Sequence, residues 1–226
     1  MYVIQASRLS NVVHGQTTKG IMRPKLRLIA IFFALASFAA AQEVERFNFS
    51  LSGAGVFSKS STSPDGSLTL KPTNSAAEIG SFRWRLNHLN GLEVNIGHTM
   101  NSQVYLLSPN SFRVATGITE FSGDYVLSPM KTERWEPFLF GGAGVLRFNP
   151  GNTYINGLLS SFPVKQQTAL SFLYGAGTDY RLWRFLSLRL QYRGLIYKAP
   201  NFGQPNLATH AKGHLAEPAV GIVVKF

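Results

Sequence analysis

The sequence contains no cysteine, which excludes a disulfide framework and any thiolate zinc site. A run of Lys and Arg is also missing, although the formal net charge is +11. The basic residues are spread singly through the chain and form no recognition motif, so we exclude a nucleic-acid partner. Long hydrophobic runs are absent as well, because the uncharged stretch 28–38 is only about half of the roughly 20 residues that a membrane-spanning helix needs.

What that stretch does resemble is the middle of a secretory signal peptide. Arg23, Lys25 and Arg27 precede it, and small residues ending at Ala41 follow it. A basic start, a short apolar run and a small-residue cleavage site are the three parts of such a signal. We therefore predict a signal peptide over 22–41 with cleavage after Ala41.

A complete signal that opens at Met22 leaves residues 1–21 without a role. They have no apolar periodicity, so we expect Met22 to be the true start and residues 1–21 not to belong to the protein. The mature domain is then 42–226. It keeps 17 basic and 11 acidic residues.

From residue 42 onward, two-residue alternation of apolar and polar side chains recurs between turn-rich segments, and no helical period is found. The alternating stretches exceed the usual five or six residues of a soluble strand and suit a tilted membrane crossing of about nine to eleven. We therefore predict an all-β fold, an eight-stranded antiparallel up-and-down transmembrane β-barrel. The eight predicted strands are 44–57, 75–87, 92–101, 113–127, 135–148, 167–181, 185–198 and 215–226.

The predicted connections alternate between long and short, which puts all the long ones at one end. Long outer loops and tight periplasmic turns are typical of bacterial outer-membrane barrels. The long connections are 58–74, 101–112, 149–166 and 199–214, and the short ones are 88–91, 128–134 and 182–184. A soluble sandwich gives no reason for this asymmetry.

Each strand has an apolar face and a mostly polar face. In 185–198, Leu188 and Leu190 alternate with Arg189 and Gln191. A soluble barrel such as a lipocalin would put its apolar face inward, and periodicity alone does not decide between the two. The loop asymmetry and the signal peptide favour a membrane barrel with polar residues inside.

Aromatic residues supply a second membrane signature, because rings with polar edges collect where hydrocarbon meets the headgroups. The alternative is that they are core residues of a soluble sandwich. The residues that we assign to a periplasmic girdle are Trp84, Tyr125, Trp135, Tyr180 and Trp183. Those that we assign to an outer girdle are Phe57, Phe148 and Phe172.

The last strand alternates and ends in phenylalanine, as do the terminal strands by which the barrel-assembly machinery recognises outer-membrane proteins. The residues of this assembly signal are Val220, Ile222, Val224 and Phe226. Together with the Gly-rich stretches 140–144 and 174–177, and with 192–198, the chain resembles small OmpA/OmpX-type outer-membrane β-barrels over 42–226.

The resemblance implies a bacterial outer-membrane location, with outer-membrane lipid and lipopolysaccharide as surroundings and the assembly machinery as a partner during biogenesis. It departs from the longer members of the family in one respect. The sequence leaves no segment after 215–226 for their peptidoglycan-binding domain. We therefore expect no cell-wall tethering.

Charged residues on the polar faces are expected to fill the lumen. An eight-stranded barrel is just wide enough for side chains to fill, and an unpaired charge in a closed interior costs several kcal/mol. We interpret the set as a structural network of ion pairs, and the alternative is a narrow ion path through a wet gap. The predicted network is Arg83, Arg85, Glu93, Glu120, Asp124, Glu136, Arg147, Asp179, Arg189 and Arg193.

No motif indicates catalysis, a cofactor or a metal. Lipid enzymes on similar barrels use a histidine with a serine and a carboxylate near the outer rim, where His98, His210 and His214 lie. His98 faces the lipid by strand parity, and the other two flank a loop without a nucleophile motif. The Gly-rich strands lack a phosphate-loop pattern and a following helix. We therefore expect no enzyme, no cofactor and no metal site.

The outer loops are net basic, since Lys59, Lys71, Lys165 and Lys212 face only one acid, Asp65. Such loops are suited to lipopolysaccharide phosphates or an acidic partner. We therefore expect a non-enzymatic structural or surface-interaction protein. A small pore or passive diffusion channel is the alternative, and a lipid-modifying enzyme is a third hypothesis.

Overall fold

The computed structural model describes residues 46–226. The predicted signal peptide, its cleavage site and the start at Met22 lie outside the described residues. Within 46–226, no helix is long and apolar enough to cross a membrane.

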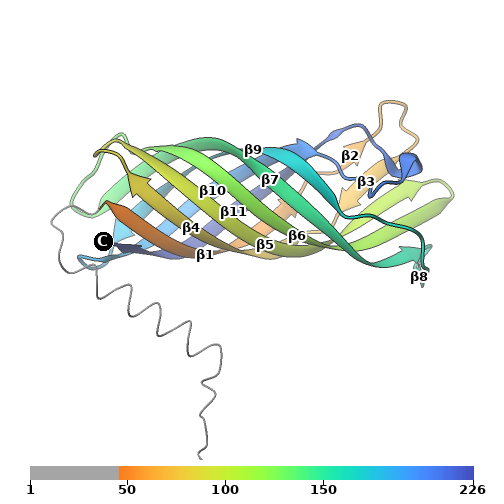
Figure 1. The fold of residues 1–226 in the computed structure, drawn as a ribbon, viewed down its shortest axis with the longest axis horizontal. Helices are drawn as coiled ribbons and strands as arrows, with labels where there is room; N and C mark the ends of the chain where they lie inside the picture. Colours follow the sequence, from red (N-terminus) through yellow and green to blue (C-terminus); the bar gives the residue numbers. More distant parts are fainter. Residues whose placement is uncertain (1–45) are drawn as a thin grey trace, which may run out of the picture. The chain divides into compact units, whose positions relative to one another are not determined.

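Eight long antiparallel strands form a closed barrel, which confirms the predicted fold (Figure 1). Each strand pairs with its neighbours in the chain, and the first and last strands pair to close the ring. The barrel strands are β1 (Phe47–Ser58), β4 (Ser75–Arg85), β5 (Asn90–Leu107), β6 (Asn110–Leu127), β7 (Trp135–Ile155), β9 (Gln167–Arg181), β10 (Leu186–Lys198) and β11 (Lys212–Lys225).

The two ends of the barrel differ, as the loop lengths predict. The turn end holds the short connections and the last residue, Phe226, and the loop end holds the long connections (Figure 1). The loop end also carries short elements: β2 (Ser61–Thr62), β3 (Thr69–Pro72), β8 (Leu158–Leu159) and the 3-10 turn η2 (Pro205–Leu207).

Two of the predicted long loops are largely strand. β5 and β6 stay paired as far as Leu107 and Asn110, so the loop predicted over 101–112 shrinks to a tight turn. β7 continues to Ile155 and pairs with β8, where the prediction begins a loop at 149. In the sequence analysis, polar residues such as Asn101 were the reason for predicting a loop. Beyond the membrane, polar side chains on the outer face of a strand contact water and do not destabilise it, so these segments remain paired.

Side chains alternate between lumen and exterior along every strand, which confirms the predicted direction of the faces. On β10, Arg189 and Arg193 are fully buried, whereas Leu190 and Tyr192 are exposed. β11 behaves in the same way, with Val220 and Ile222 exposed. Phe226 completes the seam with β1, because its backbone exchanges two 2.9 Å hydrogen bonds with Phe47.

Glycine on β7 leaves no room for a side chain beside the backbone of β6. A Cβ atom at Gly142 would collide with the carbonyl oxygen of Gly123 and would lie 2.7 Å from the Cα of Asp124. Neither neighbouring backbone can move without breaking the ladder between β6 and β7. Gly142 is therefore required by close packing against β6.

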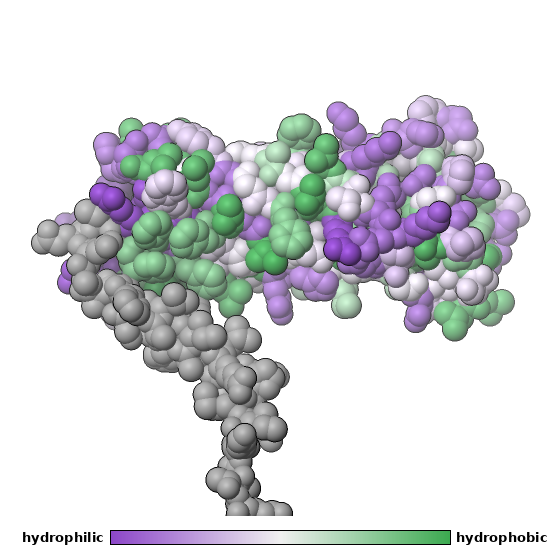
Figure 2. All heavy atoms as spheres, viewed as in Figure 1, coloured by the Kyte–Doolittle hydropathy of each residue, from purple (hydrophilic) through white to green (hydrophobic). Residues whose placement is uncertain are grey.

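The exterior carries a broad apolar belt. Figure 2 shows hydrophobic side chains concentrated over the left and middle of the barrel and mostly hydrophilic ones over the loop end. Exposed apolar residues on different strands include Leu51, Val94, Phe121, Leu170 and Ile222. Water would not favour so large an apolar surface on one protein, and a lipid bilayer does, so the belt marks the membrane-spanning zone.

Aromatic residues border this belt at the turn end. Trp84, Trp135 and Trp183 are about half exposed there, and the ring centroids of Trp135 and Tyr180 lie 4.8 Å apart. Tyr125 is exposed beside them.

The predicted outer girdle is partly wrong. Phe57 and Phe172 face outward, but Phe148 is completely buried in the lumen against Tyr197, with 5.7 Å between the ring centroids. Phe148 occupies an even position on β7, and even positions on that strand point inward as far as Phe148.

Candidate functional site

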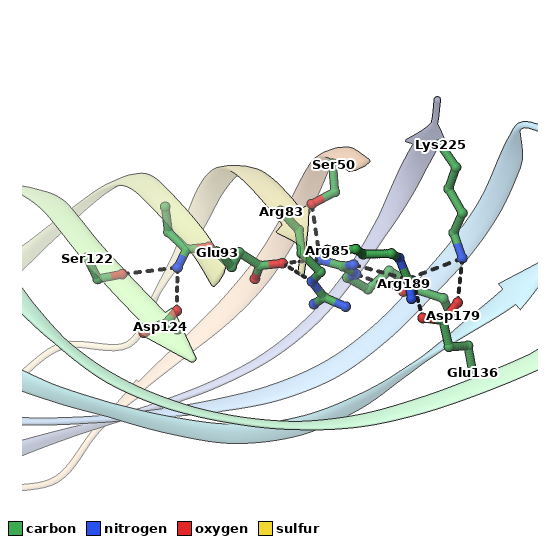
Figure 3. Close-up of polar contacts among 11 residues, drawn as sticks. Ser50, Arg83, Arg85, Glu93, Ser122, Asp124, Glu136, Asp179, Arg189 and Lys225 are labelled. Carbon is green, nitrogen blue, oxygen red and sulfur yellow. Dashed lines mark hydrogen bonds and ion pairs between the residues drawn. The ribbon is translucent and has the colours of Figure 1, made fainter. Parts of the chain in front are cut away.

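The turn-end half of the lumen holds a network of ion pairs (Figure 3). Arg189 on β10 lies at its centre. Its Nε donates to Asp179 Oδ1 at 2.8 Å, and a terminal nitrogen donates to Glu93 Oε2 at 3.1 Å. Arg83 on β4 donates from Nε to the same Glu93 oxygen at 2.6 Å. Both guanidinium groups lie over the ring of Phe138, with their Cζ atoms 4.9 and 4.3 Å from its centroid, which adds cation–π attraction.

The network continues toward the turn end through Glu136 on β7. Lys225 Nζ donates to Glu136 Oε2 at 2.8 Å and lies 3.8 Å from Asp179 Oδ2. Arg85 pairs with the same Glu136 carboxylate. Each carboxylate is thus shared by two cations, which offsets the cost of burying these charges. We call this set the turn-end network; its members are Arg83, Arg85, Glu93, Glu136, Asp179, Arg189 and Lys225.

A second group lies nearer the middle of the lumen. Arg193 pairs with Glu120 at 2.5 Å and with Glu217 at 3.4 Å. Among residues 46–226, Asp124 has no cation at bonding distance, and it instead accepts a 2.5 Å hydrogen bond from the amide nitrogen of Asn95. The five residues come from four different strands, so the contacts hold β5, β6, β10 and β11 together across the lumen.

The structure brings nine of the ten predicted lumen charges into these two groups. Arg147 differs: it faces outward on β7, is exposed, and donates to Gln166 Oε1 at 2.9 Å. The prediction placed it inside because the neighbouring residues give no clear polar face. Two members were missed, Glu217 and Lys225. Strand parity alone would have found both, since odd positions on β11 point inward.

The loop-end half of the lumen is largely apolar, with Asn101, Gln103 and Thr116 among its buried polar side chains, and the sequence analysis did not anticipate this. Inward-facing residues of the barrel wall there pack as a core of the kind found in soluble proteins. We call this group, with the loop residues that join it, the plug. Its wall members are Val56, Ile79, Tyr105, Val114, Ile118, Leu146, Phe148, Leu173, Leu195, Tyr197 and Leu215, and its loop members are Leu68, Leu70, Ala199, Phe202 and Leu207.

The connection 199–211 closes the plug from above. Phe202 has no exposed surface, and its ring meets the edge of Tyr105 with 6.4 Å between centroids. The hydroxyl of Tyr105 donates to Pro200 O at 2.7 Å. Gln167 Oε1 accepts the backbone N–H groups of Asn201 and Phe202 at 2.9 and 3.0 Å. Apolar packing and hydrogen bonds therefore both hold this segment across the mouth.

Very little space remains where the plug meets the mid-lumen charges. A small cavity of about 10 Å³ lies there, bordered by Ile79, Ile118, Glu120 and Glu217 among others. That is room for about one water molecule.

Comparison with known proteins agrees with this geometry. No protein-family profile matches the chain, and no curated protein matches it either. Among solved structures, Neisserial surface protein A is 15% identical and has a TM-score of 0.52, covering 80% of this chain and 97% of its own. OprG of Pseudomonas aeruginosa is also 15% identical, with a TM-score of 0.51 over 80% of this chain and 96% of its own.

This is the fold of a small outer-membrane β-barrel. The apolar belt, the turn-end aromatics and the closed eight-stranded ring are its physical requirements, since a bilayer accepts no unpaired strand edge. The outer-membrane barrel described here differs from a simple water-filled tube because one half of its lumen is filled by ion pairs and the other by the plug.

The three histidines near the loop end of this outer-membrane barrel, His98, His210 and His214, are not brought together. His98 faces outward, with Nδ1 3.4 Å from Thr119 Oγ1, and His214 faces outward with Nε2 2.9 Å from the Tyr174 hydroxyl. His210 is exposed in the connection 199–211. Across residues 46–226, neither a serine nor a carboxylate is hydrogen-bonded to them, and no group of three or more potential ligands is placed to hold a metal.

The loop end of the outer-membrane barrel is strongly basic. Its acids outside the lumen are Asp65 and Glu78 within the described chain. Hydrogen bonds from Ser63 and Ser67 lower the pKa of Asp65 to about 2, so this carboxylate stays charged at neutral pH. The cationic side chains there are Lys59, Lys71, Arg113, Arg147, Lys165, Lys198 and Lys212.

Proposed function

We propose that this outer-membrane barrel is a plugged structural or surface-interaction protein that neither conducts ions nor catalyses a reaction. The plug carries the proposal. It fills the loop-end half of the lumen with apolar side chains, and the turn-end network fills the other half with paired charges. A pore needs a continuous polar path, and the 10 Å³ cavity between the two halves offers none.

Planar-bilayer recording tests this directly. The purified, heat-modifiable barrel is expected to show no unitary conductance steps, because ions would have to cross the plug without hydration. An open porin inserted in the same bilayer serves as the positive control. Reproducible unitary steps from this chain would instead support the alternative, a small diffusion channel.

The basic loop end supports a surface role. We expect Lys59, Lys71, Lys165 and Lys212 to attract lipopolysaccharide phosphates, since the loop end has few acids to neutralise them. Replacing all four with glutamine is expected to abolish the salt dependence of lipopolysaccharide binding. The control is a variant in which Arg134 and Arg184, which lie at the turn end, are replaced with glutamine. Unchanged, salt-dependent binding by the fourfold variant would contradict the hypothesis.

A further inference from the structure

Two lysines stand directly opposite each other on the outside of the barrel. The register of β10 and β11 pairs Lys198 with Lys212, and both side chains point outward and are exposed. Ala199 N donates to Ala211 O at 3.1 Å, so the adjacent lysine pair is of the non-hydrogen-bonded kind, in which side chains approach most closely. Like charges directly opposite destabilise a sheet unless an anion lies between them.

A third lysine extends this positive surface onto β1 and the segment after it. Lys59 follows the end of β1, and its backbone N–H donates to His214 O at 2.9 Å, which places it beside the outward face of β11. Within 46–226, none of the three lysines forms an ion pair. We call Lys59, Lys198 and Lys212 the lysine cluster.

A shallow, widely open groove lies on the outer face of the same strands, nearer the turn end. Its volume is about 740 Å³ and its lining is mostly apolar. It spans four strands, with Leu190 and Tyr192 on β10 in the middle and the small residues Gly53 and Gly55 on β1 and Ala176 on β9 on either side. Lipid chains surround this part of the belt, so the occupant of the groove is hydrocarbon.

The spacing of cluster and groove matches one lipid molecule. Four residues separate Gly55 from Lys59, about 13 Å along the strand, and a tilt of 35–45° reduces this to about 10 Å of depth. The polar zone of one leaflet is about 5–8 Å thick, so a phosphate at the lysine cluster places its acyl chains at the level of the groove. The ring of Tyr174 lies between the two, over Gly194, and bonds His214.

We propose that the lysine cluster and the groove together bind one phosphate-bearing lipid in the leaflet at the loop end. The phosphate lies on Lys59, Lys198 and Lys212, and one acyl chain lies in the groove. The lipid phosphate is the anion that relieves repulsion between Lys198 and Lys212. This inference rests on the proposed surface role of the loop-end lysines, of which Lys59 and Lys212 are members, and it is independent of the plug, so the lipid site and the non-conducting function fail separately.

Native mass spectrometry of the whole barrel tests the headgroup. The protein is released from phosphatidylcholine nanodiscs that contain a minor fraction of phosphatidylglycerol, and the retained lipid is counted. Wild type is expected to retain one phosphatidylglycerol, and K59Q/K198Q/K212Q to retain it roughly tenfold less. K71Q/K165Q removes loop-end lysines outside the cluster and is expected to match wild type. Equal retention by the cluster variant and wild type would overturn the site.

A second pair of variants tests the groove. A Cβ atom at either Gly53 or Gly123 has no neighbour within 4 Å, so both positions accept leucine, but only Gly53 lines the groove. G53L is expected to reduce phosphatidylglycerol retention severalfold, and G123L to leave it unchanged. Displacement of the lipid by inorganic phosphate alone, or equal retention by both variants, would show that the groove takes no acyl chain. A heat-dependent shift in mobility verifies that each variant is folded.

Discussion

Replacing Arg189 with methionine is expected to lower the free energy of unfolding by about 3–5 kcal/mol, the usual result of breaking a buried ion pair from one side. Arg189 is fully buried and bonds both Asp179 and Glu93. Without it, Asp179 keeps only the 3.8 Å contact with Lys225. Urea unfolding in phosphatidylcholine vesicles, followed by the fluorescence of the three tryptophans, measures the change.

Two companion variants separate the ion pair from general damage. R147M changes an exposed, outward-facing arginine on another barrel strand, β7. It is expected to change the free energy of unfolding by no more than about 0.5 kcal/mol. R189M/D179N removes the carboxylate that R189M leaves poorly paired, and it is expected to recover part of the lost stability. A loss no larger for R189M than for R147M would show that the turn-end network contributes little to stability.

The second large effect is expected from a single added methyl group. G142A places a Cβ atom against the carbonyl oxygen of Gly123 and the backbone of Asp124, which are fixed by the β6–β7 ladder. Overpacking of this kind typically costs about 1–3 kcal/mol, and here it meets backbone on both sides, so the upper part of that range is expected. The same urea unfolding measurement applies, together with the yield of heat-modifiable barrel.

The neighbouring glycine supplies the control. A Cβ atom at Gly141 would lie 3.8 Å from Leu173 O, an ordinary contact, on the outward face. G141A shares the change in backbone entropy and propensity with G142A, but it makes no collision. Similar unfolding free energies for the two variants would mean that the barrel wall relaxes around residue 142, and that close approach is not the reason for glycine there.

Strand number, strand faces and the two different ends all follow from the sequence, because a bilayer outside and a narrow lumen inside impose strict alternation. Arg189 and Leu190 have opposite environments for that reason. The pattern weakens on β7, where Phe138 and Phe140 point inward and Leu139 points outward. Because apolar residues occupy both faces of β7, the sequence pattern does not show whether Arg147 and Phe148 point into the lumen or outward.

The plug could not be predicted from the sequence, for a different reason. Phe202 and Leu207 lie in a segment rich in polar and turn residues, where nothing in the local pattern distinguishes a buried ring from an exposed one. The burial of Phe202 depends on Tyr105, almost a hundred residues away, and on Gln167. Such contacts arise only after the ring closes, so they belong to tertiary structure and not to sequence periodicity.

The position of the plug makes the loop end sensitive to cold. When the structure loosens, side chains of the belt pass from one apolar environment to another. Loosening the plug, in contrast, exposes Phe202, Leu207 and their neighbours to water. Hydration of apolar surface raises the heat capacity, so the free energy that holds the plug closed passes through a maximum and falls again on cooling. Calorimetry of the reconstituted barrel would then resolve a loop-end transition with a heat-capacity step of its own.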